Sequence, residues 1–289
     1  MKIGLAGINV GTLAVPEFGR LASLAEELGY ESLWTAEHIV LPDLPAGQTP
    51  RPGTTPFLDS MAVLGYLAAK THTLKLATGV LLLPQHNPLL LAKQLASVDV
   101  LCGGRLIVGI GVGGIEEEAR AMAAPMSQRG SRADDYLNAM IALWTMEHPH
   151  YSGRHVSFEG INAYPRPVQQ PHPPFVVGGR AEGAIKRTVR YASGWYGYAM
   201  NLDQTREIIQ TIEAAKQRYD RPADLGDIEI TIAPREPVTS ATIDAYAELG
   251  VSRLLVRPAN DRGVDAAEAD IRQYAPVSAT PASASAARV

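Results

Sequence analysis

Short apolar runs alternate with amphipathic helical patterns along most of the chain. Lys2–Ala6 is the first apolar run, and after it leucine and alanine recur at helical spacing from about Pro16 until Gly29. Most runs are continuous rather than alternating, which is typical of strands buried on both faces of a parallel sheet. We predict eight strands, over residues 2–6, 32–35, 74–83, 106–110, 175–177, 194–199, 228–233 and 253–256. Helices are predicted from about residue 16 to 28, through 61–67, and over 88–101, 129–144, 182–192, 204–219 and 239–249.

Eight strand and helix units in 289 residues favour an α/β fold of the closed (β/α)8 TIM-barrel type. An open sheet is disfavoured because it would leave two edges to protect. Residues 148–174 are rich in Pro, Gly and His and predict an insertion between strands four and five, with a small hairpin. We expect one TIM-barrel domain over residues 1–276, followed by a disordered tail over the small, polar residues 277–289.

Composition narrows the classes of protein to which the chain can belong. With 46% hydrophobic residues, 19% charged residues and a net charge of -4, it reads as a soluble globular protein that binds no nucleic acid. The first ten residues do not resemble a signal peptide, and no run approaches the roughly 18 apolar residues of a membrane span. We therefore expect a cytoplasmic protein with no membrane contact. The single cysteine, Cys102, excludes a disulfide framework and a cysteine-based zinc site within one chain.

Two strand ends carry residues suited to chemistry, since catalytic groups of such barrels lie at the carboxyl ends of the strands. Glu37 and His38 follow the second strand and place a carboxylate beside an imidazole, which exchanges protons near neutral pH. Thr78-Gly79-Val80 interrupts the third apolar run, and a glycine there marks a bulge or the close approach of a ligand. Hydrogen bonding to the barrel rim and simple packing are the structural alternatives.

A third strand end predicts a phosphate site. Gly178-Gly179-Arg180 follows the fifth strand and leads directly into a helix. Free backbone amides, the helix dipole and a guanidinium can converge there on one phosphate. A plain turn with a surface arginine is the alternative.

Two other patterns are interpreted as structural. GIGVGG at 109–114 formally contains GxGxxG, but the acid about 20 residues on, Asp134, lies in a helical pattern, so a tight turn is favoured over a dinucleotide fingerprint. Four histidines in the insertion lack metal-ligand spacing, and we expect no metal site at His148, His150, His155 or His172.

The strand ends, taken in order, resemble the luciferase-like monooxygenase family, and in particular its branch that depends on the deazaflavin coenzyme F420. The matching stretches are ELGYESLWTAEH, LATGVLLLPQHNPLLLAKQLASVDVLCGGRLIVGIGVGG, YSGRHVSFEG, RPVQQPHPPFVVGG and ASGWYGY, within about residues 1 to 260. The resemblance implies that Glu37 and His38 lie beside the deazaflavin ring. It also implies a bulge behind the ring at Thr78, Gly79 and Val80, with a non-proline cis peptide at Gly79–Val80. Cofactor phosphate contacts are implied at Gly178 and Gly179, with Arg180 beside them.

One position departs from the family pattern. The acid that follows the fourth-strand glycines in the sugar-phosphate dehydrogenase members is Gly114 here, and Glu116, Glu117 and Glu118 are offset by two or more positions. The chemistry of those dehydrogenases is therefore not carried over to this chain.

The expected reaction is hydride transfer between the deazaflavin and a small organic substrate. His38 would exchange the proton, with Glu37 as its orienting or charge partner. The loop 42–56 and the insertion near His155 would cover the substrate, and the resemblance implies a homodimer.

Three alternatives stay open. They are a monooxygenase that uses FMN, a non-catalytic flavin-binding relative, and an unrelated barrel lyase or hydrolase. The third would use a lysine or paired carboxylates at strand ends, and no predicted strand ends in a lysine.

Overall fold

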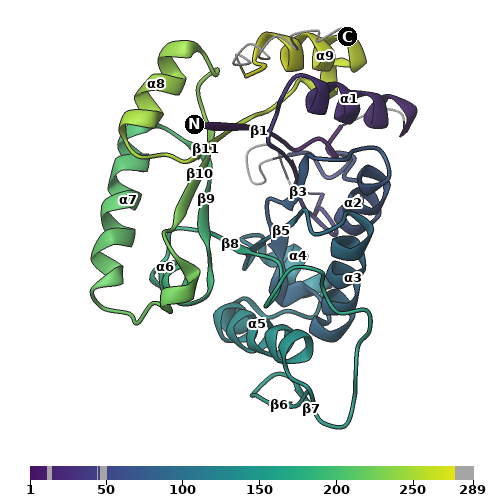
Figure 1. Cartoon of the computed structure of the whole chain (residues 1–289), viewed down its shortest axis with the longest axis vertical. Helices are drawn as coiled ribbons and strands as arrows, with labels where there is room; N and C mark the ends of the chain where they lie inside the picture. The colour runs from purple at the N-terminus through teal and green to yellow at the C-terminus, as the bar shows by residue number, and fades with distance from the viewer. Residues whose placement is uncertain (12–14, 44, 46–50, 277–289) are drawn as a thin grey trace, which may run out of the picture.

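The computed structural model describes residues 1–11, 15–43, 45 and 51–276, which form a closed barrel surrounded by helices (Figure 1). The barrel strands are β1 (Lys2–Ala6), β2 (Ser32–Thr35), β3 (Lys75–Thr78), β5 (Leu106–Gly111), β8 (Phe175–Gly178), β9 (Gly194–Met200), β10 (Glu229–Pro234) and β11 (Arg253–Val256). All eight are parallel to their neighbours, and the pairings of β1 with β11 and of β3 with β5 close the sheet. The predicted TIM barrel is confirmed. The tail predicted over 277–289 lies outside the described residues.

One predicted strand is divided in two. The run 74–83 forms β3 and a short continuation, β4 (Leu81–Leu82), which pairs with the far end of β5. Between them the chain leaves the ladder at Gly79 and Val80. A bulge therefore lies at the carboxyl end of the third barrel strand, where the glycine indicated one.

Helices cover the outside of the barrel, with α2 and α3 on one side and α7 and α8 on the opposite side (Figure 1). Asn87 caps α3 by accepting hydrogen bonds from the amides of Leu89 and Leu90, and Pro88 occupies the first turn, where its missing N–H costs nothing. The helices are α1 (Val15–Glu27), α2 (Ser60–Ala68), α3 (Pro88–Leu101), α4 (Glu116–Ala121), α5 (Arg129–Thr145), α6 (Glu182–Tyr191), α7 (Leu202–Lys216), α8 (Ser240–Glu248) and α9 (Val264–Gln273). Among the described residues, none of these helices has the length and apolar character needed to cross a membrane.

The last helix, α9, is absent from the sequence-based prediction. It packs beside α1, where the Tyr30 hydroxyl donates a hydrogen bond to the Ile271 carbonyl oxygen over 2.8 Å. Ala267 and Ile271, four positions apart, are fully buried against the core. The helix therefore follows the ordinary amphipathic rule and joins the end of the barrel to its beginning.

The insertion after α5 contains the predicted hairpin, formed by β6 (Tyr151–Ser152) and β7 (Ser157–Phe158). Asp135 on α5 accepts hydrogen bonds from the Tyr151 hydroxyl at 3.1 Å and from the His155 amide at 2.6 Å. The His155 ring lies 2.8 Å from the Ser131 hydroxyl. These contacts hold the hairpin to α5.

One side chain from each strand contributes to an apolar layer inside the barrel. These residues are Ala6, Trp34, Ala77, Ile107, Val176, Tyr196, Ala233 and Leu255. The rings of Trp34 and Tyr196 stack with centroids 5.7 Å apart, and alanines from three other strands leave them room. The interior is therefore a packed layer rather than a channel, and a ligand must enter above it or below it.

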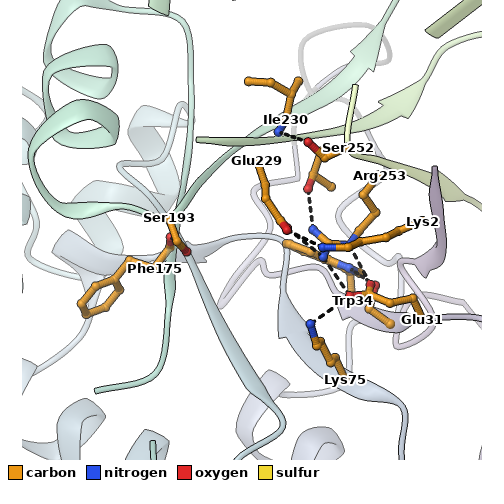
Figure 2. Close-up of polar contacts among 12 residues, drawn as sticks. Lys2, Glu31, Trp34, Lys75, Phe175, Ser193, Glu229, Ile230, Ser252 and Arg253 are labelled. Atoms are coloured by element: carbon orange, nitrogen blue, oxygen red, sulfur yellow. Dashed lines mark hydrogen bonds and ion pairs between the residues drawn. The ribbon is translucent and has the colours of Figure 1, made fainter. Parts of the chain in front are cut away.

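An ionic network centred on Arg253 lies at the amino-terminal end of the barrel (Figure 2). Its buried guanidinium makes two hydrogen bonds to Glu31, at 2.7 and 2.9 Å, one to the Thr231 hydroxyl at 2.9 Å and one to Glu229 at 3.1 Å. Lys75 lies 3.2 Å from the same Glu31 carboxylate. Burial alone would raise the pKa of Glu31, but the hydrogen bonds and charge of Arg253 outweigh it and lower this pKa to about 2. This end of the barrel contributes stability, and chemistry is expected at the other end.

Candidate active site

A cavity of about 430 Å³ lies at the carboxyl ends of β4, β5, β8 and β9. This volume falls within the range of small-molecule sites. Tyr196 and Trp195 contribute to its lining, together with Val80 and Leu82. Five glycines also line it, at Gly111, Gly113, Gly178, Gly179 and Gly197. Much of the wall is therefore flat backbone, which suits a planar ligand.

The bulge projects the Val80 side chain into this cavity wall. The Gly79–Val80 peptide bond is cis, which confirms the prediction for this position. A Cβ on Gly111 would lie 2.7 Å from Val80 Cγ2, and one on Gly178 would lie 3.2 Å from Val80 Cγ1. Side chains at these two positions would displace Val80, so the glycines of two neighbouring strands make room for the bulge.

Thr78, which the sequence predicts as a cofactor contact, uses its hydroxyl within the barrel wall. The hydroxyl donates to the Gly109 carbonyl at 2.7 Å and accepts from the Gly109 amide at 2.8 Å. The next amide, that of Gly79, donates to the Thr35 carbonyl at 2.6 Å. Thr78 thus bridges β3 to β5 at the point where the ladder breaks, and it holds the bulge in place.

The predicted phosphate turn borders the same cavity. Gly179 has a φ of +112°, and a Cβ there would lie 3.2 Å from the Ala184 side chain, so the turn requires glycine. Ala181, the N-cap residue of α6, offers no capping side chain, which leaves first-turn amides available to an anion. Arg180 and Arg235 also line the cavity, and its described lining contains no acidic side chain. The electrostatics of this end favour a negatively charged ligand group.

His38 pairs with a glutamate from a different element. Its Nδ1 lies 3.0 Å from Oε2 of Glu118 on α4, and the other oxygen of Glu118 accepts the Ile39 amide at 2.9 Å. The Glu118 side chain is completely buried, and 21% of the His38 side chain is exposed. Phe57 packs edge-on against the imidazole with ring centroids 5.1 Å apart. A carboxylate at Nδ1 favours the proton on that nitrogen, so in the neutral imidazole the lone pair lies on Nε2.

The prediction that Glu37 is the partner of His38 is wrong. Oε2 of Glu37 accepts the Leu82 amide at 2.6 Å and lies 3.0 Å from His86 Nε2. Successive side chains in extended backbone point in opposite directions, so neighbours in sequence need not face each other. Glu37 instead anchors β4, and Leu82 of β4 lines the cavity.

Apart from Thr78 and Gly79, which bond within the barrel wall, the predicted site residues fall into two adjoining groups. Val80, Gly178, Gly179 and Arg180 line one cavity, whereas Glu37 and His38 lie at the neighbouring strand end and are absent from its lining. Residues 44 and 46–50 of the predicted covering loop lie outside the described residues. Phe57, directly after that loop, packs against His38. In the described ranges, no group of three or more His, Cys, Asp or Glu side chains could hold a metal ion.

Sequence reasoning missed Glu118 and His86. Glu118 lies four positions after Gly114 on α4, and its side chain contacts His38. The three successive acids Glu116, Glu117 and Glu118 indicated an acidic side chain in this region. Only the position of helix α4 shows which of them points inward. For His86 the sequence carried no signal beyond its place directly before Asn87, the N-cap residue of α3.

Comparison with known proteins gives the family. Residues 5–288 match the family model described as luciferase-like monooxygenase. The chain belongs to the luciferase-like monooxygenase family. Members of this family are oxidoreductases and monooxygenases, which sets the class of chemistry to expect at the barrel mouth.

Two proteins of similar sequence and one of similar fold differ in how much of each chain is matched. The uncharacterized protein Rv0953c of Mycobacterium tuberculosis is 34% identical over 265 residues, which is 88% of this chain and 91% of that protein. The FMNH2-dependent dimethylsulfone monooxygenase of Pseudomonas putida is 32% identical over 141 residues, 48% of this chain and 38% of that protein. The structure of an F420-dependent secondary alcohol dehydrogenase in complex with an F420-acetone adduct superposes with a TM-score of 0.74 at 15% identity, over 94% of this chain and 98% of that one.

Proposed function

We propose that this protein is a coenzyme F420-dependent oxidoreductase that transfers a hydride between the deazaflavin and a small organic substrate. The observation that carries the proposal is the cavity, whose glycine-rich wall includes the Val80 bulge and the turn of Gly178 and Gly179 with Arg180 beside it. The F420-dependent dehydrogenase supports this choice, because its fold matches 94% of this chain and 98% of its own.

The residues present fit such a cofactor, which combines a planar ring with a phosphate-bearing chain. Val80 would support one face of the ring, and the backbone of Gly178 and Gly179 with the Arg180 guanidinium would hold the phosphate. Once bound, the deazaflavin supplies the carbon that gives or takes the hydride. The protein's contribution is to fix the ring against the bulge and to leave its other face open to the substrate.

His38 is proposed to exchange the proton that accompanies hydride transfer. Glu118 holds Nδ1, so Nε2 is the nitrogen that can take or return a proton at the substrate. Because Glu118 is buried, it keeps the imidazole in one orientation and one tautomer. Phe57 restricts the ring from the side.

An FMN-dependent monooxygenase is the second candidate, and the 32% identity to the dimethylsulfone monooxygenase favours it. A non-catalytic relative would bind the cofactor without turnover. The homodimer implied by the family resemblance stays a proposal, which light scattering tests.

Parallel fluorescence titrations with F420 and with FMN test the proposed function. We expect saturable binding of F420 and much weaker binding of FMN at the same ionic strength. The variant Gly179→Ala serves as a control in each titration, since a side chain at this φ of +112° disturbs the phosphate turn. Tight binding of FMN with no binding of F420 would exclude the proposal.

A further inference from the structure

Gln85 is a buried side chain whose polar atoms are both unused. It ends the short 3-10 helix η1 (Leu83–Gln85), which follows β4 directly, and 6% of it is exposed. Neither the amide nitrogen nor the amide oxygen has a hydrogen-bond partner in the structure. A buried amide without partners is costly, so such a group calls for an explanation.

Two other buried side chains have an unpartnered polar atom, but both are bonded elsewhere. Asn260 leaves its oxygen free while its nitrogen donates to the carbonyls of Gly7, Ile8 and Val10. Arg132 leaves Nε free while Nη1 donates to the Tyr136 hydroxyl. Among the described residues, Gln85 thus differs in lacking a partner at both ends of its amide.

The amide lies next to the cavity wall. A Cβ built on Gly113 would be 3.2 Å from Gln85 Nε2, and Gly113 lines the cavity. Gly113 has a φ of +75°, a conformation that favours glycine, so the wall carries no side chain at this point. Leu82, three positions before Gln85, lines the cavity as well. Gln85 itself is not part of the cavity lining, and its amide nitrogen lies against the position that a side chain on Gly113 would take.

We propose that Gln85 binds the polar edge of the planar ring that occupies this cavity. A glutamine amide presents one acceptor oxygen and a donor nitrogen side by side. A cyclic imide edge, with its carbonyl and N–H neighbours, is complementary to that pair. Both the deazaflavin and the flavin ring carry such an edge, so the inference rests on the proposed cofactor site but not on which ring occupies it.

The phosphate-bearing part of the ligand requires different chemistry. Arg180 and Arg235 are charged and suit a phosphate, whereas Gln85 is neutral and offers a donor and an acceptor together. A neutral amide discriminates by geometry, because a ligand that lacks the complementary pair leaves both groups buried and unbonded. Gln85 is therefore assigned to orientation and selection of the ring.

Gln85→Met separates this role from a structural one. Methionine is close in shape and has no hydrogen-bonding amide, so the ligand-free variant should melt at the wild-type temperature or about 2 °C above it. Its affinity for F420 and for FMN, measured by separate titrations, should fall about tenfold for whichever ring the wild type binds. The matched control is Gln169→Met, at the other end of the barrel. Gln169 donates to Asp99 at 2.7 Å and to the Leu106 carbonyl at 2.8 Å, so this variant should melt lower and bind the ring as before.

A ring methylated at its imide nitrogen tests the same contact on the wild-type chain. Methylation replaces the N–H donor, so wild type should bind the methylated ring about tenfold more weakly, and Gln85→Met should show little difference between the two rings. Equal affinities of wild type and Gln85→Met, or an equal cost of methylation in both, would overturn the inference while leaving the proposed function standing. If Gln85→Met does not fold, Gln85→Glu takes its place. Binding of the methylated ring to the wild-type protein still tests the contact. If wild type binds neither ring, the proposed function and this inference fall together.

Discussion

Nδ1 of His38 lies 3.0 Å from Oε2 of Glu118, although 80 positions separate the two residues in the chain. The other oxygen of Glu118 accepts the amide of Ile39, so the carboxylate is held at both ends and is completely buried. Such a group sets the orientation and the tautomer of the imidazole. The nitrogen proposed to exchange the proton is therefore Nε2, on the side away from Glu118.

Glu118→Gln should reduce turnover while preserving cofactor affinity. Glutamine has one acceptor oxygen where glutamate has two, so it cannot accept from both His38 Nδ1 and the Ile39 amide. We expect kcat to fall about 10- to 100-fold with an unchanged dissociation constant for F420. Nitrogen-15 NMR of the labelled histidine would show the loss of the Nδ1-protonated tautomer, a readout that needs no substrate.

Glu116→Gln is the matched control on the same short helix. Glu116 is exposed, so its replacement should leave kcat and the His38 tautomer as in wild type. A similar loss in both variants would show that the effect comes from the charge of α4 rather than from the contact with His38.

Glu37→Gln should act through the position of β4 rather than through proton exchange by His38. The carboxylate accepts the Leu82 amide and contacts His86, and Leu82 lines the cavity. Weakening these bonds should lower the free energy of unfolding by about 1–2 kcal/mol and weaken ring binding. The His38 tautomer should stay unchanged in the NMR spectrum. A shifted tautomer with unchanged stability would contradict this assignment.

Arg180→Ala should weaken binding of the phosphate-bearing cofactor and leave binding of the bare ring unchanged. Arg180 is exposed at the cavity, so solvent screening limits its contribution, and we expect about a tenfold loss. Titrations of the complete cofactor and of the ring without phosphate, each at low and high salt, measure the difference. An equal loss for both ligands would place the phosphate elsewhere.

Acid should destabilise the protein through Glu31. Its pKa is lowered from 4.5 to about 2 in the folded state, so the stabilisation is complete above pH 4.5 and is lost as the pH falls toward 2. The loss should not exceed about 3 kcal/mol in the free energy of unfolding. Glu26 adds to the same window, because the backbone amides of Thr73, Leu74 and His72 outweigh burial and lower its pKa to about 2. Urea unfolding of wild type and Glu31→Gln between pH 2 and 7 should give a flatter curve for the variant.

Arg253→Met should lower stability without affecting the cofactor site. Removing the guanidinium leaves Glu31 and Glu229 facing each other without their shared partner, which should cost about 3 kcal/mol. The network lies at the amino-terminal end of the barrel (Figure 2), so affinity for F420 should be that of wild type once the chain is folded. A large loss of affinity in a folded variant would mean that the two ends of the barrel are coupled.

The fold could be predicted from the sequence because glycine and proline separate the apolar runs, and each run is long enough to form one strand of the barrel. Gly79 indicated the bulge because it interrupts the third apolar run. The pairs His38–Glu118 and Glu37–His86 could not be predicted from the sequence. They join residues that are 80 and 49 positions apart in the chain, and they depend on the direction of each side chain. The helix α9 could have been found, because Ala267 and Ile271 have helical spacing.

A crystal structure of the complex with F420 tests the central claim most directly. The account predicts the ring against Val80, its imide edge at Gln85 and its phosphate at Gly178 and Gly179, with His38 Nε2 facing the open side of the ring. A ring bound away from Val80, or a phosphate distant from the glycine turn, would contradict the account.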